Sequence, residues 1–265
     1  MDLSGTTALV TGANRGIGRA LTEALAGRGL KLVLAGVRDP DSFEPIEGVQ
    51  PVRMDLSSRE SIDECVDALD LTDVNLLVNN AGQMTGGLLE EQEMDAVYAM
   101  FQVNLVAVAH LTSRVLPAML ARRHGTVVNN ASISGYAYFP AASTYAASKA
   151  GVVALSESLR RELEGTGVSV LHLVTPGVRT DMLDATQDVY GRHMDTADWP
   201  SVEPEDWAAR VVSAIEDDKQ VLGPGGRLAA AKLMSRGPGK LLDLVSARMY
   251  QREPRDAGRP PRSRG

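Results

Sequence analysis

The chain has 265 residues, 44% of them hydrophobic and 23% charged, and its formal net charge is −7. This length is enough for one domain with its own core, and the acidic balance argues against nucleic-acid binding. The lone Cys65 excludes a disulfide framework and a cysteine-built zinc site, and the histidines are too scattered to suggest another metal site. With an acidic N-terminus and no apolar run of about 20 residues, we expect a cytoplasmic protein without a signal peptide or membrane span.

Short apolar runs alternate along the chain with longer amphipathic stretches. The runs predict strands at 6–12, 30–37, 50–54, 74–82, 125–132, 168–177 and 219–223. The stretches predict helices near 16–28, 57–69, 90–122, 144–165 and 204–217. Because the strands are apolar almost throughout, both faces of the sheet should be covered. This pattern predicts an α/β fold with a parallel sheet and helices on both faces.

Capping signals support two of the predicted helix starts. The stretch 57–62 reads as a capping box, with Ser57 or Ser58 followed by Glu60 or Ser61, and the Ser57/Glu60 pairing fits better. Pro204, followed by acidic residues, should open the last helix.

We expect residues 1–250 to form a single catalytic domain. Three segments after the sixth strand differ from the rest of the chain. Residues 181–203 have weak periodicity and follow a strand end, where a flap over a substrate site could lie. Residues 224–250 predict a C-terminal extension of one or two amphipathic helices. The tail 251–265 is rich in Arg, Pro and Gly, and we expect it to be disordered.

A glycine-rich turn follows the first predicted strand. Gly12, Gly16 and Gly18 have the spacing G-x-x-x-G-x-G, with Asn14, Arg15 and Ile17 between them. Such a turn lets a backbone approach a pyrophosphate, and the helix that follows offers free N–H groups to it. A purely structural turn would use glycines too, but the position between strand and helix favours dinucleotide binding.

Charge near the second strand end bears on the choice of dinucleotide. An NAD site usually places an acid there to hold the ribose hydroxyls, whereas this strand ends with Gly36, Val37 and Arg38. Arg15 and Arg38 together would suit a 2′-phosphate. A shifted strand end could instead bring Asp39 to the ribose. We therefore predict NADP(H) in preference to NAD(H).

Seven motifs in order resemble the short-chain dehydrogenases/reductases in their single-domain form, over residues 3–223. They are TGANRGIG (11–18), Asp55–Leu56, NNAG (79–82), Asn104, Ser132, YAASK (145–149) and Pro176–Gly177. The resemblance implies a Rossmann-like doubly wound seven-stranded sheet in the order 3-2-1-4-5-6-7. It also implies a small-molecule carbonyl or alcohol substrate and a homodimer or homotetramer.

Tyr145 and Lys149 lie four residues apart and so share one face of a helix. A cation there should lower the pKa of the phenol. The resemblance implies that Tyr145 protonates the carbonyl oxygen, that Lys149 also binds the nicotinamide ribose, and that Ser132 stabilises the same oxygen. Ser134 is a rival for the role of Ser132. Asn104 is similar to an asparagine that holds a water near the lysine, although it could simply hold a loop or a helix kink.

Other cofactor contacts follow from the resemblance. Asp55 would accept a hydrogen bond from the adenine amine with Leu56 alongside, unless Asp55 only caps a helix. The adenosine would lie on Asn80, Ala81 and Gly82, and the nicotinamide near Pro176, Gly177, Val178 and Thr180. Thr180 stands one residue earlier than the family's usual threonine, so its reach toward the carboxamide is in question.

Loops after the strands supply candidate substrate residues. Met84, Ser134, Tyr138 and Met182 are the main ones, and Gln83, Tyr136, Phe139 and Val178 are further candidates. These mainly apolar and aromatic residues predict a largely apolar ketone or alcohol as substrate, reduced with NADPH. Enoyl reductases of the same superfamily usually space the tyrosine and lysine farther apart, and extended epimerases need a larger C-terminal domain. A non-catalytic NADP-binding regulatory protein would tend to lose the tyrosine or lysine.

Overall fold

The computed structural model describes residues 1–194 and 199–224, with the backbone alone for 186–188. Seven parallel strands form one sheet in the order β3-β2-β1-β4-β5-β6-β9. The strands are β1 (Thr7–Thr11), β2 (Leu32–Val37), β3 (Val49–Arg53), β4 (Val74–Asn79), β5 (Gly125–Asn130), β6 (Val168–Leu173) and β9 (Val221–Leu222). The predicted sheet order is therefore confirmed, because the two intervening strands, β7 and β8, belong to a separate ladder.

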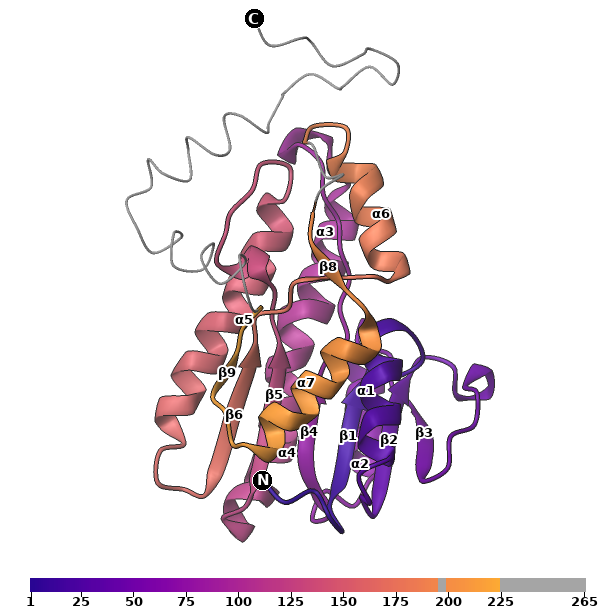
Figure 1. Cartoon of the computed structure of the whole chain (residues 1–265), viewed down its shortest axis with the longest axis vertical. Helices are drawn as coiled ribbons and strands as arrows, with labels where there is room; N and C mark the ends of the chain where they lie inside the picture. The colour runs from indigo at the N-terminus through magenta and orange to yellow at the C-terminus, as the bar shows by residue number, and fades with distance from the viewer. Residues whose placement is uncertain (195–198, 225–265) are drawn as a thin grey trace, which may run out of the picture.

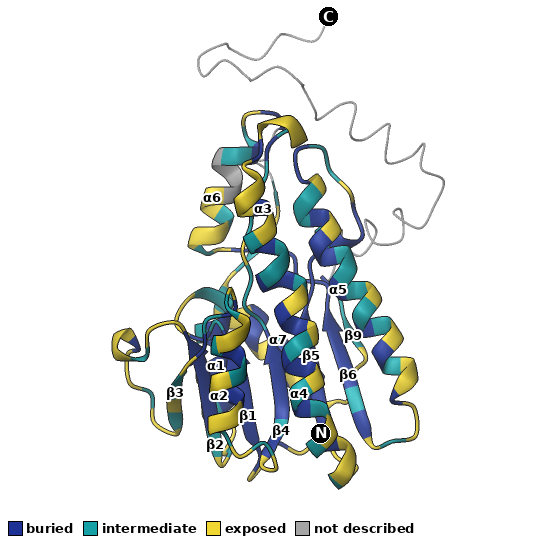
Figure 2. Cartoon of the chain, turned by 180° about the vertical axis from the view of Figure 1, so that it is seen from behind, coloured by how far each residue is buried: buried dark blue, intermediate teal, exposed yellow. Residues whose placement is uncertain are grey.

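Helices cover the sheet on both faces, as Figures 1 and 2 show from opposite sides. On one face lie α1 (Gly16–Ala26) and α7 (Pro204–Glu216), and on the other lie α2 (Arg59–Ala68), α4 (Ala107–Arg122) and α5 (Ser143–Glu162). Side chains of β1 alternate between the two cores: Ala8 and Val10 join the α1–α7 side, and Leu9 joins the other. Every residue of β1 is buried, which explains its unbroken apolar run.

The two predicted helix starts have different outcomes. Pro204 occupies the first turn of α7, with Glu205 and Asp206 beside it, as expected. The favoured Ser57/Glu60 capping pair is wrong, because Ser58 is the N-cap of α2 and its hydroxyl accepts from the Ser61 N–H at 3.1 Å. The Ser57 hydroxyl instead donates to Asp55, which draws it away from the helix.

The single helix predicted over 90–122 is interrupted in the structure. It consists of a short 3₁₀ turn η2 (Leu89–Glu91), α3 (Met94–Phe101), a π-helical turn η3 (Gln102–Val106) and α4. By length and composition, Met94–Arg122 is the one helical stretch among residues 1–194 and 199–224 that could cross a membrane. Here its apolar side packs on the sheet through Val103, Leu111 and Val115, so its hydropathy reflects the core.

The region predicted as a flap contains a helix, α6 (Asp181–Tyr190). Before it, β7 (Gly177–Val178) pairs with β8 (Ser201–Val202), which ties the two ends of the segment together. Figure 1 shows α6 beyond the sheet, at the end of the molecule away from the N-terminus. We call residues 181–203 the flap. Short 3₁₀ turns η1 (Pro40–Ser42) and η4 (Ile133–Gly135) complete the elements. The helices predicted within 224–250 and the tail 251–265 lie outside the described residues, except for residue 224.

Candidate active site

A cavity of about 520 Å³ lies where the strands of the sheet end, beneath the flap. The residues predicted to bind cofactor or substrate mostly line it. From the cofactor set these are Gly12, Asn14, Arg15, Gly16, Ile17, Gly18, Arg38, Asp55, Leu56, Asn80, Ala81, Gly82, Tyr145, Lys149, Pro176, Gly177, Val178 and Thr180; from the others, Met84, Ser132, Ser134 and Met182. Asn104 and Tyr138 are not among the lining residues.

The glycine turn has the close approach that a dinucleotide site needs. Gly12 has φ +64°, and a Cβ on it would lie 3.0 Å from the Ala81 Cα. A Cβ on Gly18 would lie 2.0 Å from the Gly12 carbonyl oxygen. The first turn of α1 contains no acidic residue and has no side-chain cap from Arg15, so its N–H groups remain available to an anion. This backbone cradle fits the pyrophosphate of a dinucleotide.

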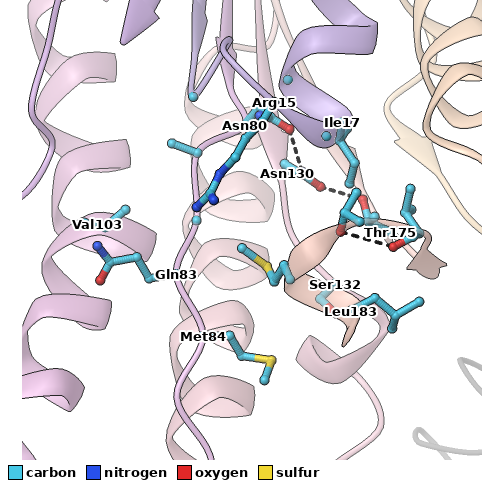
Figure 3. A pocket seen from close by; sticks show the side chains of 18 of the residues that line it. Arg15, Ile17, Asn80, Gln83, Met84, Val103, Asn130, Ser132, Thr175 and Leu183 are labelled. Atoms are coloured by element: carbon cyan, nitrogen blue, oxygen red, sulfur yellow. Dashed lines mark hydrogen bonds between the residues drawn. The ribbon is translucent and has the colours of Figure 1, made fainter. Parts of the chain in front are cut away.

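Three polar side chains link the strand ends beneath the cavity, as Figure 3 shows. The Asn130 amide donates to Asn80 Oδ1 at 3.0 Å, and its own oxygen accepts from the Thr175 hydroxyl. Asn80 also donates to the Thr11 carbonyl. The ends of β1, β4, β5 and the loop after β6 are thereby held in register. Sequence reasoning missed Asn130 and Thr175; the signal was a polar residue close after each apolar run.

Tyr145 and Ser132 both line the cavity. Tyr145 lies in the first turn of α5, and Ser132 caps η4 by accepting from the Ser134 N–H at 3.1 Å. Gly135 lets η4 approach α5 closely, since a Cβ there would lie 2.9 Å from the Lys149 carbonyl oxygen. The hydroxyl of Ser132 is near enough to the phenol of Tyr145 to act on its pKa, which it lowers. Both hydroxyls can therefore address one substrate oxygen. Ser134 also lines the cavity, but its backbone N–H serves to orient Ser132.

Lys149 is a buried cation beside the cavity. Its Nζ donates to the Asn130 carbonyl at 2.8 Å, and a Cβ on Gly82 would lie 3.5 Å from it. Burial lowers the pKa of Lys149 to about 8. The expected lowering of the Tyr145 pKa is wrong for this structure: burial raises that pKa, and the hydrogen bond from Ser132 opposes the rise. Desolvation is the largest effect on this pKa, and the Lys149 amine is directed at the backbone of Asn130.

Asn104 occupies the π-helical turn, behind the cavity wall. Its Oδ1 accepts from the Gln83 N–H at 2.8 Å, and its amide donates to the Gln83 carbonyl and to Ser148 Oγ. These bonds tie the loop after β4 to α5. In this structure Asn104 therefore holds the loop after β4 in place.

Arg15 and Arg38 lie at the nucleotide end of the cavity, and both are exposed. Arg15 also reaches Asp181 of the flap at 3.9 Å. Asp39 is not among the lining residues; its carboxylate caps η1 by accepting from the Asp41 N–H. In this structure the Asp39 carboxylate is thus engaged at η1 and does not line the cavity. Asp55 lines the wall, and hydrogen bonds from Ser57 hold the pKa of its carboxyl below the usual value.

The flap side of the cavity is apolar and aromatic. Met84 and Met182 line it as predicted, together with Leu183, Tyr190 and Trp199, which sequence reasoning missed. Tyr138 is a correction: it is 57% exposed and lies outside the lining, because the η4 loop directs it to solvent. Tyr136 is also outside the lining and hydrogen-bonds His172 in the core at 2.8 Å. No cluster that could hold a metal ion occurs in the described part of the chain.

Thr180 lies between the glycine turn and the flap. A Cβ on Gly16 would lie 3.0 Å from its methyl group, and its hydroxyl donates to the Val178 carbonyl at 3.2 Å. Its carbonyl accepts from the Leu183 N–H at the start of α6. Despite its early position in the sequence, Thr180 therefore lines the cavity, where it anchors the flap.

Comparisons with known proteins agree with this geometry. A family model described as short chain dehydrogenase matches residues 6–190. An uncharacterized oxidoreductase of Staphylococcus aureus is 32% identical over 222 residues, covering 81% of this chain and 92% of that protein. The 3-oxoacyl-[acyl-carrier-protein] reductase of Haemophilus influenzae is 34% identical over 194 residues, covering 70% and 79%. A crystal structure of a short chain dehydrogenase from Burkholderia cenocepacia in complex with NADP superposes with a TM-score of 0.81 at 26% identity, covering 93% and 99%.

Proposed function

The chain belongs to the short-chain dehydrogenase family, and we propose that it is an NADPH-dependent carbonyl reductase acting on a largely apolar ketone or aldehyde. One observation carries the proposal. The hydroxyl-bearing side chains of Tyr145 and Ser132 line one cavity, which has a glycine-built anion cradle at one end and an apolar flap at the other. A nucleotide and a carbonyl compound could therefore meet at one phenol.

Tyr145 is the group that we propose to supply the proton. Burial keeps its pKa above the usual value, so the phenol is protonated at neutral pH and ready to donate. Ser132 would donate a second hydrogen bond to the same oxygen and stabilise the charge that develops there. The dinucleotide, when bound, supplies the hydride.

Lys149 would support the reaction through its charge. With a pKa of about 8, it is mostly protonated at neutral pH although buried. An ammonium next to the Asn130 carbonyl and Gly82 would favour the phenolate left on Tyr145 after proton donation. Asn104 acts as a positioning residue, through Gln83 and Ser148.

The preference for NADPH is supported by charge at the nucleotide end. Arg15 and Arg38 line the cavity, whereas the carboxylate of Asp39 caps η1. Guanidinium groups suit a 2′-phosphate, which an acid would repel. NADPH in turn favours the reductive direction. The NADP complex of the Burkholderia cenocepacia protein is consistent with this preference.

The substrate preference is supported by the flap side. Met84, Met182, Leu183, Tyr190 and Trp199 offer apolar and aromatic surface, which favours an uncharged substrate over a sugar phosphate. We further propose that the protein works in the cytoplasm as a homodimer or homotetramer. Val106 and Leu120, 50% and 37% exposed along the η3–α4 helix, support such packing. Light scattering on a sizing column would measure the assembly.

The proposal is tested by ketone-dependent oxidation of NADPH with identification of the product. Apolar ketones should be turned over to alcohols, and sugar phosphates should not. If only charged substrates react, the substrate assignment is wrong. If saturated products arise from an α,β-unsaturated carbonyl with its C=O intact, the protein is an enoyl reductase. If NADPH binds and no compound is reduced, a regulatory role replaces the enzyme.

A further inference from the structure

Tyr190 closes the flap side of the cavity in a defined orientation. It is the last residue of α6 and only 3% exposed. Its ring packs on Gly86, where a Cβ would lie 2.6 Å from the Tyr190 Cε1. On another side it meets Trp199, with ring centroids 6.1 Å apart and planes tilted by 56°. The absence of a side chain at Gly86 is what allows the ring to seat here.

The hydroxyl of Tyr190 has a poor acceptor within the described residues. It donates to the Met84 sulfur at 3.8 Å, and a thioether is a weak hydrogen-bond acceptor. A buried O–H donor forms a stronger hydrogen bond with an oxygen than with a sulfur. An oxygen atom of a bound ligand would therefore be a better acceptor for this hydroxyl than Met84 is. Burial, with a smaller effect of Tyr145, raises the pKa of Tyr190, so it remains a neutral donor at any working pH.

The reacting oxygen of the substrate does not need this donor. A carbonyl oxygen has two lone pairs, and Tyr145 and Ser132 would donate to both. Tyr190 lines the same cavity as that pair. A third donor there must meet a different acceptor on the same substrate.

We propose that Tyr190 is a specificity-determining residue that donates a hydrogen bond to a second oxygen of the substrate, and that the preferred substrates are therefore oxo esters or diketones with an apolar remainder. This inference rests on the proposed reductase function. The second oxygen lies close to the reacting carbonyl, since both must fit beneath the flap between Tyr190 and Tyr145.

The test compares two ketones of equal chain length in the wild type and Tyr190→Phe. Ethyl acetoacetate carries the second oxygen, and methyl pentyl ketone lacks it. We expect Tyr190→Phe to lower kcat/KM for ethyl acetoacetate about tenfold, because it removes one hydrogen bond and keeps the ring. The value for methyl pentyl ketone should change less than about twofold. Tyr98→Phe, on an exposed tyrosine of α3 outside the cavity lining, is the matched control and should change neither.

The outcomes separate the two proposals. Equal losses for both ketones in Tyr190→Phe, or no loss for either, would overturn the role of the hydroxyl and leave the reductase function standing. If the wild type reduces neither ketone, the reductase function fails for this class of substrate. In that case, the proposed role of the Tyr190 hydroxyl is tested by calorimetric titration of ethyl acetoacetate into the wild type and Tyr190→Phe, each saturated with NADP⁺. Binding that is absent, or not weakened in the variant, would overturn the inference.

Discussion

The two sides of the cavity are built in different ways. The floor, formed by the glycine turn with Asn80, Asn130 and Thr175, consists of backbone and buried polar groups that bond one another across strand ends. The flap side consists of aromatic and apolar side chains in a small cluster with Ala141 and Ala142, separate from the two cores on the sheet. Under our proposal the two sides would have different roles: the floor would fix the nucleotide and the proton donor, and the flap would select the substrate.

The largest expected effect on stability is on the floor. In Gly18→Ala the new methyl would clash with backbone, 2.0 Å from the Gly12 carbonyl oxygen. We expect a loss of about 3 kcal/mol in the free energy of unfolding and at least about tenfold weaker NADPH binding. Urea denaturation and fluorescence titration would measure them. Gly27→Ala is the control, with helical φ and nearest atoms at 3.6 Å, and should change little. Equal behaviour of the two variants would show that the turn is not tightly built.

A smaller effect concerns nucleotide choice at the edge of the floor. Arg38→Ala removes a guanidinium that would meet the 2′-phosphate, so the ratio of kcat/KM for NADPH to that for NADH should fall about tenfold. Arg59→Ala, on α2 and outside the cavity lining, should leave the ratio unchanged. An unaltered ratio in Arg38→Ala would assign the preference to Arg15 or to neither.

A substitution on the flap side should weaken substrate binding and leave nucleotide binding unchanged. In Gly86→Ala the added methyl would lie 2.6 Å from the Tyr190 ring and 3.1 Å from the Ala141 carbonyl oxygen, so the ring must shift. We expect KM for an apolar ketone to rise roughly fivefold, at a cost of about 1 kcal/mol, with NADPH affinity unchanged. Initial-rate kinetics and nucleotide titration test this. A parallel loss of NADPH affinity would mean that the two sides are not independent.

The smallest effect is a pH dependence of stability caused by Lys149. Its pKa is lowered from 10.5 to about 8 in the folded chain, so the unfolded chain binds more protons between these values. The free-energy cost of burying the protonated amine is full below about pH 8 and decreases as the pH rises above that value. Relative to Lys149→Met, the wild type should gain about 1 kcal/mol of stability from roughly pH 7 to 9. A stability difference that does not vary with pH would show that the amine is not desolvated.

Sequence alone predicted the floor far better than the flap. The sheet order was implied by the family resemblance, and the lining residues of the glycine turn follow from local spacing, since strand ends and turns recur in a fixed relation. Asn130 follows an apolar run, and that much is evident from the sequence. Its hydrogen-bond partners could not be predicted, because they belong to segments far apart in the chain. Tyr190 and Trp199 carry no periodic signal and reach the cavity only through tertiary packing on Gly86 and Phe139.

Two further errors have the same physical origin. The pKa of Tyr145 depends on burial, which a residue pair on a helix does not reveal. Tyr138 was expected in the pocket because it is aromatic and close to Ser132 in the chain, yet its position in the loop after η4 exposes it. Closeness to Ser132 in the sequence does not fix the direction of the Tyr138 side chain, because the direction of a loop side chain depends on the packing around it.

Tyr145→Phe, assayed for both ketone turnover and NADPH binding in the same preparation, tests the account most directly. The variant removes one hydroxyl from the cavity and leaves the glycine turn intact. We predict that kcat falls about 1,000-fold while the Kd for NADPH stays within about twofold, because the phenol serves proton donation and the floor serves the nucleotide. Retained turnover, or an equal loss of nucleotide binding, would contradict the assignment of Tyr145 as the proton donor.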